Sequence, residues 1–213
     1  MRKMSILVLS LLLVGCGGKH EANQSNFSNA INEFGKIDHV CLPVNLMLDN
    51  IENGAKNNIS VGAQEIKITI KNSNGDKVNK TALNQMDALV EAKVYEQGKK
   101  EELQLQNGKK VPVAVYYLSD KSKDKIVSTP QSSLLCLGTQ KVDKIVLFTE
   151  PTPANGVTVS KVVYEAKLVP EKWSEKLLKT TDENWWKSLN EPQRRTAVLV
   201  LTDKGWKDER VLH

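Results

Sequence analysis

Alternating apolar and polar positions predict strands in the middle and towards the end of the chain. Ile66, Ile68 and Ile70 alternate with polar side chains, which is the period of a strand with one buried face. Asn107-Gly108 is a strong turn signal, so residues 103–105 and 113–118 are expected to pair as a hairpin. The remaining expected strands cover residues 134–137, 144–148, 157–169 and 196–201.

Apolar side chains three and four residues apart predict short helices. Within residues 81–94 this stripe contains Leu83, Met86 and Val90. Pro170 suits the first turn of a second helix, and a third helix is expected to end before Pro192. Because strands and helices do not alternate strictly, we expect an α+β fold with a mixed or antiparallel sheet and short helices.

Residues 83–122 resemble the second half of a winged-helix module. A helix and a polar hairpin are followed by Tyr117-Leu118-Ser119-Asp120-Lys121, similar to the end of the wing in that family, with Ser122 where glycine is usual. The exposed side of the helix carries Asn84, Asp87 and Glu91, and acidic side chains repel phosphates. The resemblance therefore implies a scaffold for protein contact and no binding of nucleic acid.

The first sixteen residues have the pattern of an export signal. Arg2 and Lys3 precede an uncharged run over 4–14, which as a helix would extend roughly 16 Å, about half of a ~30 Å hydrocarbon core. The run is too short to span a membrane and has the length of a signal-peptide core. An ordinary secretory signal would show the same run.

The end of this segment, Leu13-Val14-Gly15-Cys16, resembles the lipobox of bacterial lipoproteins. The resemblance implies cleavage before Cys16, a diacylglycerol on its thiol, and acylation of the new amino group, for example with palmitate. Two or more acyl chains anchor a protein stably, whereas one anchors it only marginally. Gly17 stands where an aspartate would retain such a lipoprotein at the inner membrane, so the resemblance implies the outer membrane, facing the periplasm.

The expected domain organisation follows from this signal. Residues 1–15 are a signal peptide that is removed, and the polar residues 16–30 form a flexible tether. Residues 31–150 form the first half of the α+β domain, and residues 151–213 form a second half packed on the same body.

Composition and charge narrow the range of functions. The 213 residues are 40% hydrophobic and 26% charged, which describes a globular protein and excludes a polytopic membrane protein. The formal charge of +5 rests on 30 basic against 25 acidic residues. It falls to +3 without Arg2 and Lys3, so the charge does not indicate a nucleic-acid partner.

Cys41 and Cys136 both lie among apolar residues. An exported chain meets an oxidising compartment, where paired thiols become disulfides, so we expect a Cys41–Cys136 disulfide bond. Buried free cysteines would have similar neighbours. A catalytic Cys41 assisted by His39 is a third interpretation, but a nucleophile also needs an orienting partner and a depressed pKa, and the sequence indicates neither.

Known catalytic motifs are missing from the sequence. The only histidines are His20, His39 and His213, and no phosphate-binding glycine loop or metal-ligand pattern occurs, so we expect no enzyme activity, no cofactor and no metal.

The last 41 residues contain Trp173 and three candidate partner contacts, Trp185, Trp186 and Trp206. The alternative, which we favour for most of these tryptophans, is that they fill the core between two short helices and the sheet. The lysine-rich residues 121–125 would either contact anionic lipid or keep a loop soluble.

Together these features predict a lipid-anchored lipoprotein of the cell envelope that faces the periplasm. Its folded domain is expected to bind an envelope protein or a ligand without chemistry, in envelope assembly or in the exclusion of a phage, plasmid or toxin. The alternative is a periplasmic hydrolase-like enzyme whose carboxylates are brought together only by the fold.

Overall fold

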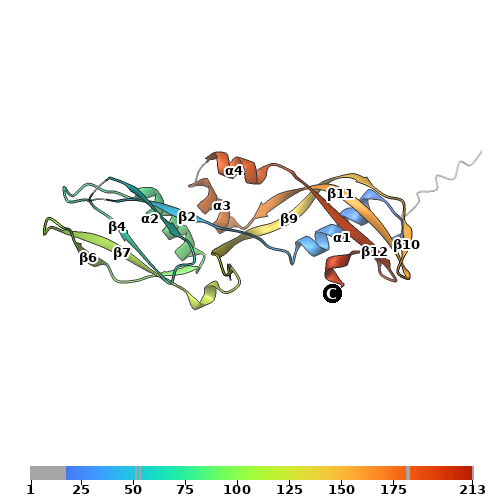
Figure 1. The fold of residues 1–213 in the computed structure, drawn as a ribbon, viewed down its shortest axis with the longest axis horizontal. Coiled ribbons are helices and arrows are strands. Elements are labelled where there is room, and N and C mark those ends of the chain that lie inside the picture. The colour runs from blue at the N-terminus through green and yellow to red at the C-terminus, as the bar shows by residue number, and fades with distance from the viewer. Residues whose placement is uncertain (1–17, 51, 53, 181–182, 213) are drawn as a thin grey trace, which may run out of the picture.

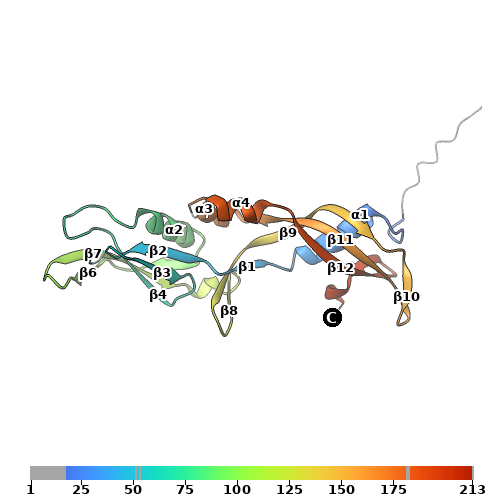
Figure 2. The same ribbon diagram turned by 45° about the horizontal axis from the view of Figure 1, so that its top comes forward.

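The computed structural model describes residues 18–212 except 51, 53, 181 and 182. The predicted signal peptide and Cys16 lie outside the described residues. The molecule is elongated, with α2 and its sheet at one end and α1 with the longest strands at the other (Figures 1 and 2). The sheets pair only antiparallel strands, and the described helices are short, which confirms the α+β class.

We call the first end the α2 body. Helix α2 (Lys80–Glu91) begins within one residue of its predicted start. One sheet has the order β4-β7-β5, with β6 also paired to β7, and a separate hairpin consists of β2 and β3. The strands are β2 (Asn45–Asp49), β3 (Lys56–Ser60), β4 (Glu65–Thr69), β5 (Tyr95–Gln97), β6 (Glu101–Gln104) and β7 (Lys110–Leu118). A hairpin forms around Asn107-Gly108 as expected, but it pairs residues 101–104 with 110–113, whereas residues 114–118 pair with β4 and β5.

We call the second end the α1 body. Its sheet has the order β1-β9-β11-β12-β13, and β10 and β8 pair with β11 and β9. The strands are β1 (Val40–Leu42), β8 (Ile126–Ser128), β9 (Ser133–Phe148), β10 (Thr152–Ala154), β11 (Val157–Pro170), β12 (Gln193–Thr202) and β13 (Gly205–Asp208). Two predicted strands, 134–137 and 144–148, are parts of the single strand β9. Register shifts in its pairing with β11 interrupt the alternation that a regular strand would show.

The predicted tether is wrong for its second half, because residues 24–30 belong to helix α1 (Gln24–Gly35). The side chain of Asn23 caps this helix by accepting a hydrogen bond from the Asn26 amide at 2.9 Å. Phe27, Ala30 and Ile31 lie on one helical face and are buried against the sheet. A stretch of mostly polar residues therefore forms a helix because its few apolar side chains share that face.

Two hydrophobic cores divide the protein differently from the predicted boundary at residue 150. The α2 body's core includes Leu135 and Leu137 from the start of β9 and Leu177 and Leu178 from α3 (Lys172–Lys179). The α1 body's core includes Ile145 from the end of the same strand. Strand β9 is thus shared by both bodies, and α4 (Glu183–Asn190) leads the chain from α3 to β12.

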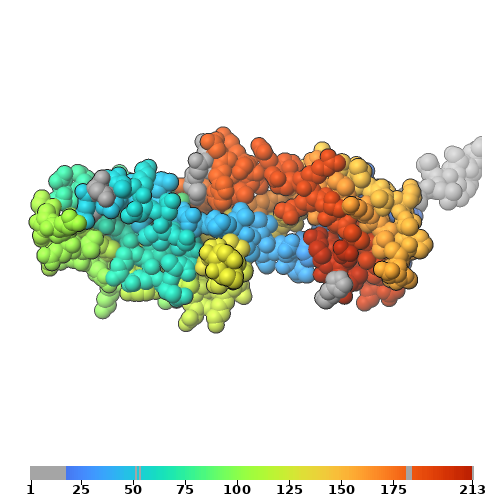
Figure 3. Space-filling model, in the orientation of Figure 1, coloured from blue at the N-terminus to red at the C-terminus, as the bar shows by residue number. Residues whose placement is uncertain are grey.

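The two bodies meet at the junction, where β1 lies beside the start of β9. In Figure 3 the blue segment that includes β1 lies in the middle of the molecule, between the two ends. Cys41 is directly opposite Cys136 in this pairing, and the two sulfurs form a disulfide of 2.02 Å. The predicted disulfide is confirmed. Gly138 lies close to β11 here, because an added Cβ would be 2.2 Å from the Val169 carbonyl oxygen. At the junction, therefore, β1 and β9 are joined covalently by the disulfide, and β9 and β11 approach so closely that only glycine fits at residue 138.

Candidate functional site

Trp206 is a core residue, so its prediction as a partner contact is wrong. Only 5% of its surface is exposed, and its ring packs edge-on against Phe27 with centroids 5.0 Å apart. Its indole N–H donates to the His20 carbonyl oxygen at 3.1 Å. The residue fails as a surface contact because β13 places it between the sheet and α1.

Trp185 and Trp186 are both half-buried on α4, where they pack against the α2 body's core. Trp173, on α3, is also half-buried, and its N–H donates to the Glu171 carboxylate at 2.6 Å. Part of the surface of Trp185 and Trp186 remains accessible, so their role as partner contacts stays a prediction.

The Cys41 sulfur is used in the disulfide, which leaves no thiolate for catalysis. His39 is therefore not the base of a Cys41 nucleophile in this state. Among the described residues, no group of three or more His, Cys, Asp or Glu side chains could hold a metal ion. The same residues include no helix of the length and apolarity needed to cross a membrane.

One cavity is a groove of about 630 Å³ at the end of the molecule where the described chain begins. We call it the α1–β13 groove. One wall is a helical stripe next to the buried face of α1. Its members are three or four residues apart and therefore share a side of the helix: Asn26, Asn29, Glu33 and the C-cap residue Lys36, with the edge of buried Ala30 beside them. The facing wall is the turn between β12 and β13 with the start of β13, residues 203–207.

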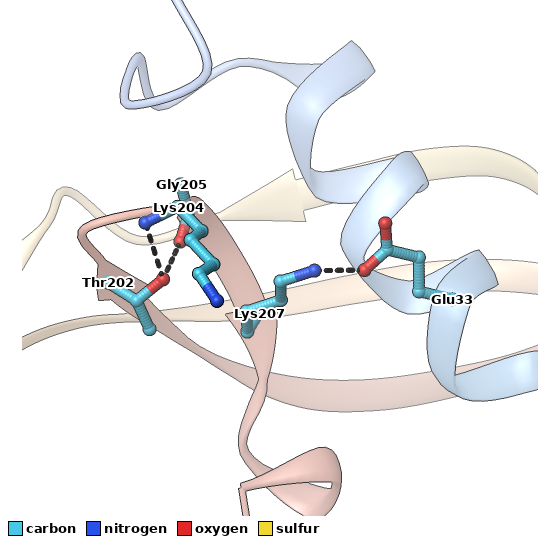
Figure 4. A network of polar contacts seen from close by, with 5 residues as sticks. All are labelled: Glu33, Thr202, Lys204, Gly205 and Lys207. Carbon is cyan, nitrogen blue, oxygen red and sulfur yellow. Dashed lines mark hydrogen bonds and ion pairs between the residues drawn. The ribbon is translucent and has the colours of Figure 1, made fainter.

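The turn that forms the second wall is fixed by its own hydrogen bonds (Figure 4). The Thr202 hydroxyl donates to the Gly205 carbonyl oxygen at 2.7 Å and accepts from the Lys204 amide at 3.2 Å. Gly205 has a φ of +101°, and an added Cβ would lie 2.7 Å from the Lys19 carbonyl oxygen. Only glycine fits here, because the turn needs a left-handed residue against neighbouring backbone.

Residues 18–23 contribute Lys19 and His20 to the groove lining and are hydrogen-bonded to both walls. The Asn26 amide donates to the carbonyl oxygens of Gly18 and Glu21, each at 2.9 Å. The His20 imidazole bonds the Asp203 carbonyl oxygen at 3.1 Å through Nε2, which is therefore the protonated nitrogen. The described chain thus begins as an ordered part of the α1 body, bound to α1 and to the turn after β12.

An ion pair with a buried carboxylate positions the far end of β13. The carboxylate of Asp208, which is fully buried, accepts from Nε and Nη2 of Arg210 at 2.8 and 2.7 Å. The Arg210 guanidinium also lies over the Phe34 ring of α1, 3.8 Å from its centroid. The hydrogen bonds to Asp208 raise the pKa of Arg210 above its usual value, and burial opposes this effect. These contacts hold β13 against α1, and so fix the distance between the groove walls.

The charges in the groove are mainly positive. Four lysines line it, Lys19, Lys36, Lys204 and Lys207, against the carboxylates of Glu33 and Asp203. Lys207 forms an ion pair with Glu33 across the groove (Figure 4). Within the described part of the chain, the ammonium groups of Lys19, Lys36 and Lys204 have no ion-pair partner, and neither has the Asp203 carboxylate. The lysines therefore outnumber the carboxylates after pairing.

The sequence by itself does not indicate this groove. Lys19 and Lys204 are far apart in the sequence, and only the packing of α1 on β13 brings them together. A signal for one wall was present, because Asn26, Glu33 and Lys36 lie beside the apolar face of Phe27 and Ile31 at helical spacing. Comparisons of the chain with protein-family models, curated proteins and solved structures gave no match. The function must therefore be argued from the residues themselves.

Proposed function

We propose that this protein is a lipoprotein of the bacterial cell envelope, anchored through Cys16 and facing the periplasm from the outer membrane. The observation that carries the proposal is Leu13-Val14-Gly15-Cys16, placed directly after an uncharged run of signal-peptide length. Acyl chains on the sulfur and on the new amino group would hold the protein at a bilayer. The folded domain binds an envelope protein or ligand and performs no chemistry.

Two structural features support this proposal. The Cys41–Cys136 disulfide suits an oxidising compartment outside the cytoplasm. The described chain begins at one end of an elongated molecule, and the β6–β7 hairpin lies at the opposite end (Figure 1). An anchor two residues before Gly18 would therefore leave the α2 body directed away from the membrane.

The α2 body supports the binding role. Helix α2, the β6–β7 hairpin and the turn after β7 follow the order of helix and wing expected for a winged-helix-like scaffold. Half-buried Trp185 and Trp186 are the contacts we assign to a protein partner, because accessible tryptophan is enriched in binding hot spots.

The anchor is tested by Cys16→Ser, compared with the wild type for intact mass, incorporation of an alkyne-labelled palmitate and membrane fractionation. We expect the variant to keep its signal peptide and to lose the label. Cys136→Ser is the matched control, because it removes a cysteine elsewhere and should keep the label. An unchanged mass and unchanged labelling of Cys16→Ser would refute the lipoprotein proposal.

The binding role is tested by Trp185→Ala and Trp186→Ala in lipidated protein solubilised from membranes. We expect at least one of them to lose a co-purifying envelope protein that the wild type retains. Tyr117→Ala removes a 45% exposed aromatic on β7 and serves as the control. Turnover of a hydrolase substrate panel by the wild type would instead favour the enzyme alternative.

A further inference from the structure

We propose that the α1–β13 groove binds the phosphate of an anionic phospholipid headgroup in the membrane that anchors the protein. This inference rests on the proposed function, since it takes Cys16 as the anchor. The groove, its unpaired lysines and its distance from Cys16 along the chain carry it together.

The groove has the chemistry of a phosphate site. Lysine ammonium groups donate up to three hydrogen bonds each and bind phosphate oxygens as point charges. Lys204 on the β12–β13 turn and Lys19 before α1 line the same cavity from different segments, and neither has an ion-pair partner in the described chain. Asn29 adds an amide donor from the α1 stripe, and no interaction with another described side chain occupies it.

The ion pair between Lys207 and Glu33 leaves the groove cationic. It neutralises the one carboxylate that α1 contributes, so that carboxylate does not repel an incoming anion strongly. Asp203 is the remaining acid, and three unpaired lysines outweigh it. Complementary charge therefore favours an anionic occupant over a neutral or cationic one.

The length of chain before the groove indicates where that anion lies. Cys16 is three residues before Lys19, and three residues span at most about 11 Å however they are arranged. The polar headgroup layer on one side of a bilayer is about 6 Å thick. An acylated Cys16 therefore holds Lys19, and with it the groove, close to the headgroup phosphates of the leaflet that contains its acyl chains. The lysines of residues 121–125 begin in the turn after β7, in another part of the molecule, and do not share this position.

The first test measures protection of lysines in the purified, lipidated full chain in neutral detergent micelles. Phosphatidylglycerol or phosphatidylcholine is added, and the acetylation rate of each lysine is read by peptide mass spectrometry. We expect phosphatidylglycerol, and not phosphatidylcholine, to slow acetylation of Lys204 several-fold. Lys161 is the internal control, because it is exposed on β11 and lies outside the groove. Equal protection by both lipids, or equal protection of Lys161, would overturn the proposal.

Inorganic phosphate, used as a separate probe, distinguishes the source of the anion. If phosphate alone protects Lys204 as strongly as phosphatidylglycerol does, the groove binds a free anion and the assignment to lipid is wrong. Weak protection by phosphate with strong protection by phosphatidylglycerol supports the lipid, because the glycerol and the position of the lipid in the micelle then contribute.

Charge-reversal variants test the residues themselves. Lys204→Glu should weaken phosphatidylglycerol binding by about tenfold, since each lysine near an anionic surface raises the affinity for that surface by roughly this factor. Lys161→Glu makes the same change in net charge outside the groove and should leave binding nearly unchanged. Asn29→Asp adds a carboxylate to the α1 wall without altering the turn, and should also weaken binding. Equal weakening by Lys204→Glu and Lys161→Glu would show a general charge effect and refute the site.

The intact mass of the same samples separates the two proposals. Acylated protein without protection of Lys204 refutes the groove and leaves the anchor in place. Protection of Lys204 in protein that carries no acyl chain refutes the anchor and retains a headgroup site.

Discussion

The α2 body and the α1 body are each held together by a different kind of long-range contact. The α2 body is built largely from one continuous stretch, and the Cys41–Cys136 disulfide encloses all of β2 to β8 in a covalent loop with a sequence separation of 95. The α1 body joins segments from both ends of the chain. Its closure is non-covalent, through Trp206 of β13 and Phe148 of β9, both edge-on to Phe27 of α1.

This difference separates two sources of stability. A disulfide acts mainly by restricting the unfolded chain, and a long loop gains most from it. An aromatic cluster acts in the folded state, by burial and by contacts between ring edges and faces. Because β9 belongs to both cores, the two bodies are also mechanically connected. Perturbing each closure by itself shows how far that shared strand couples them.

The largest effect is expected from removing the disulfide. Cys41→Ser with Cys136→Ser should lower the free energy of unfolding by about 4.5 kcal/mol, the chain-entropy value for a loop of this length. The loss should concentrate in the α2 body, because the loop contains its strands. Denaturant unfolding gives the total, and hydrogen exchange gives its distribution between β7 and β12.

Reduction of the wild type by a thiol provides the control, because it breaks the same bond without changing the sequence. Equal loss of protection in β7 and β12 would contradict the expected division. It would mean that the shared strand β9 makes the chain unfold as one unit.

A somewhat smaller effect is expected from Trp206→Ala, which opens the α1 body. Removing a buried tryptophan should cost about 4 kcal/mol, and the indole N–H also loses its bond to the His20 carbonyl oxygen. Exchange should rise in α1 and β13, with β4 and β7 less affected. Trp186→Ala, which truncates a half-buried tryptophan, should cost clearly less in the same denaturant titration.

The smallest effect concerns pH and falls in the α2 body. The Tyr95 hydroxyl donates to the Ala63 carbonyl oxygen at 2.9 Å and accepts from the Gly62 amide at 2.8 Å. Burial raises the pKa of Tyr95, although the bond from Gly62 opposes the rise. The folded-state pKa therefore lies above the unfolded value near 10. The resulting stabilisation is complete below pH 10 and is lost as the pH rises from there through the folded-state pKa.

Tyr95→Phe should cost about 1 kcal/mol at neutral pH and should reduce the alkaline loss of stability. Thermal unfolding measured from pH 7 to 11 gives both values. Tyr116→Phe is the matched variant, because burial, with the charge of Asp87, raises the pKa of Tyr116 as well. An alkaline decline that is as steep in Tyr95→Phe as in the wild type would exclude Tyr95 as its cause.

Much of the sheet structure could be predicted from local patterns. Strand β4 alternates regularly, and α2 has an apolar stripe at helical spacing, so both appear close to their expected positions. Strand β2 was missed, because exposed Met47 lies between buried Leu46 and Leu48 and conceals the alternation. Pro170 ends β11 instead of opening a helix, since α3 begins two residues later at Lys172.

The groove could not be predicted from local sequence patterns, and the reason is different from that for β2. Its walls come from the beginning and the end of the chain, and nothing in the sequence near Lys19 indicates that it meets the β12–β13 turn. Cys41 and Cys136 were predicted as a pair because, with Cys16 acylated, they are the two thiols left in an oxidising compartment and allow only one pairing. Lysines are numerous and usually solvated, so a particular cluster of them can be identified only after the packing is known.

The contact of α1 with β13 also has a consequence during biosynthesis. Phe27 leaves the ribosome long before Trp206, which covers it and lies much later in the sequence. Until then the apolar face of α1 has no complete binding surface within its own chain. A product that stops short of β13 would carry this face uncovered, in a form that chaperones and proteases recognise.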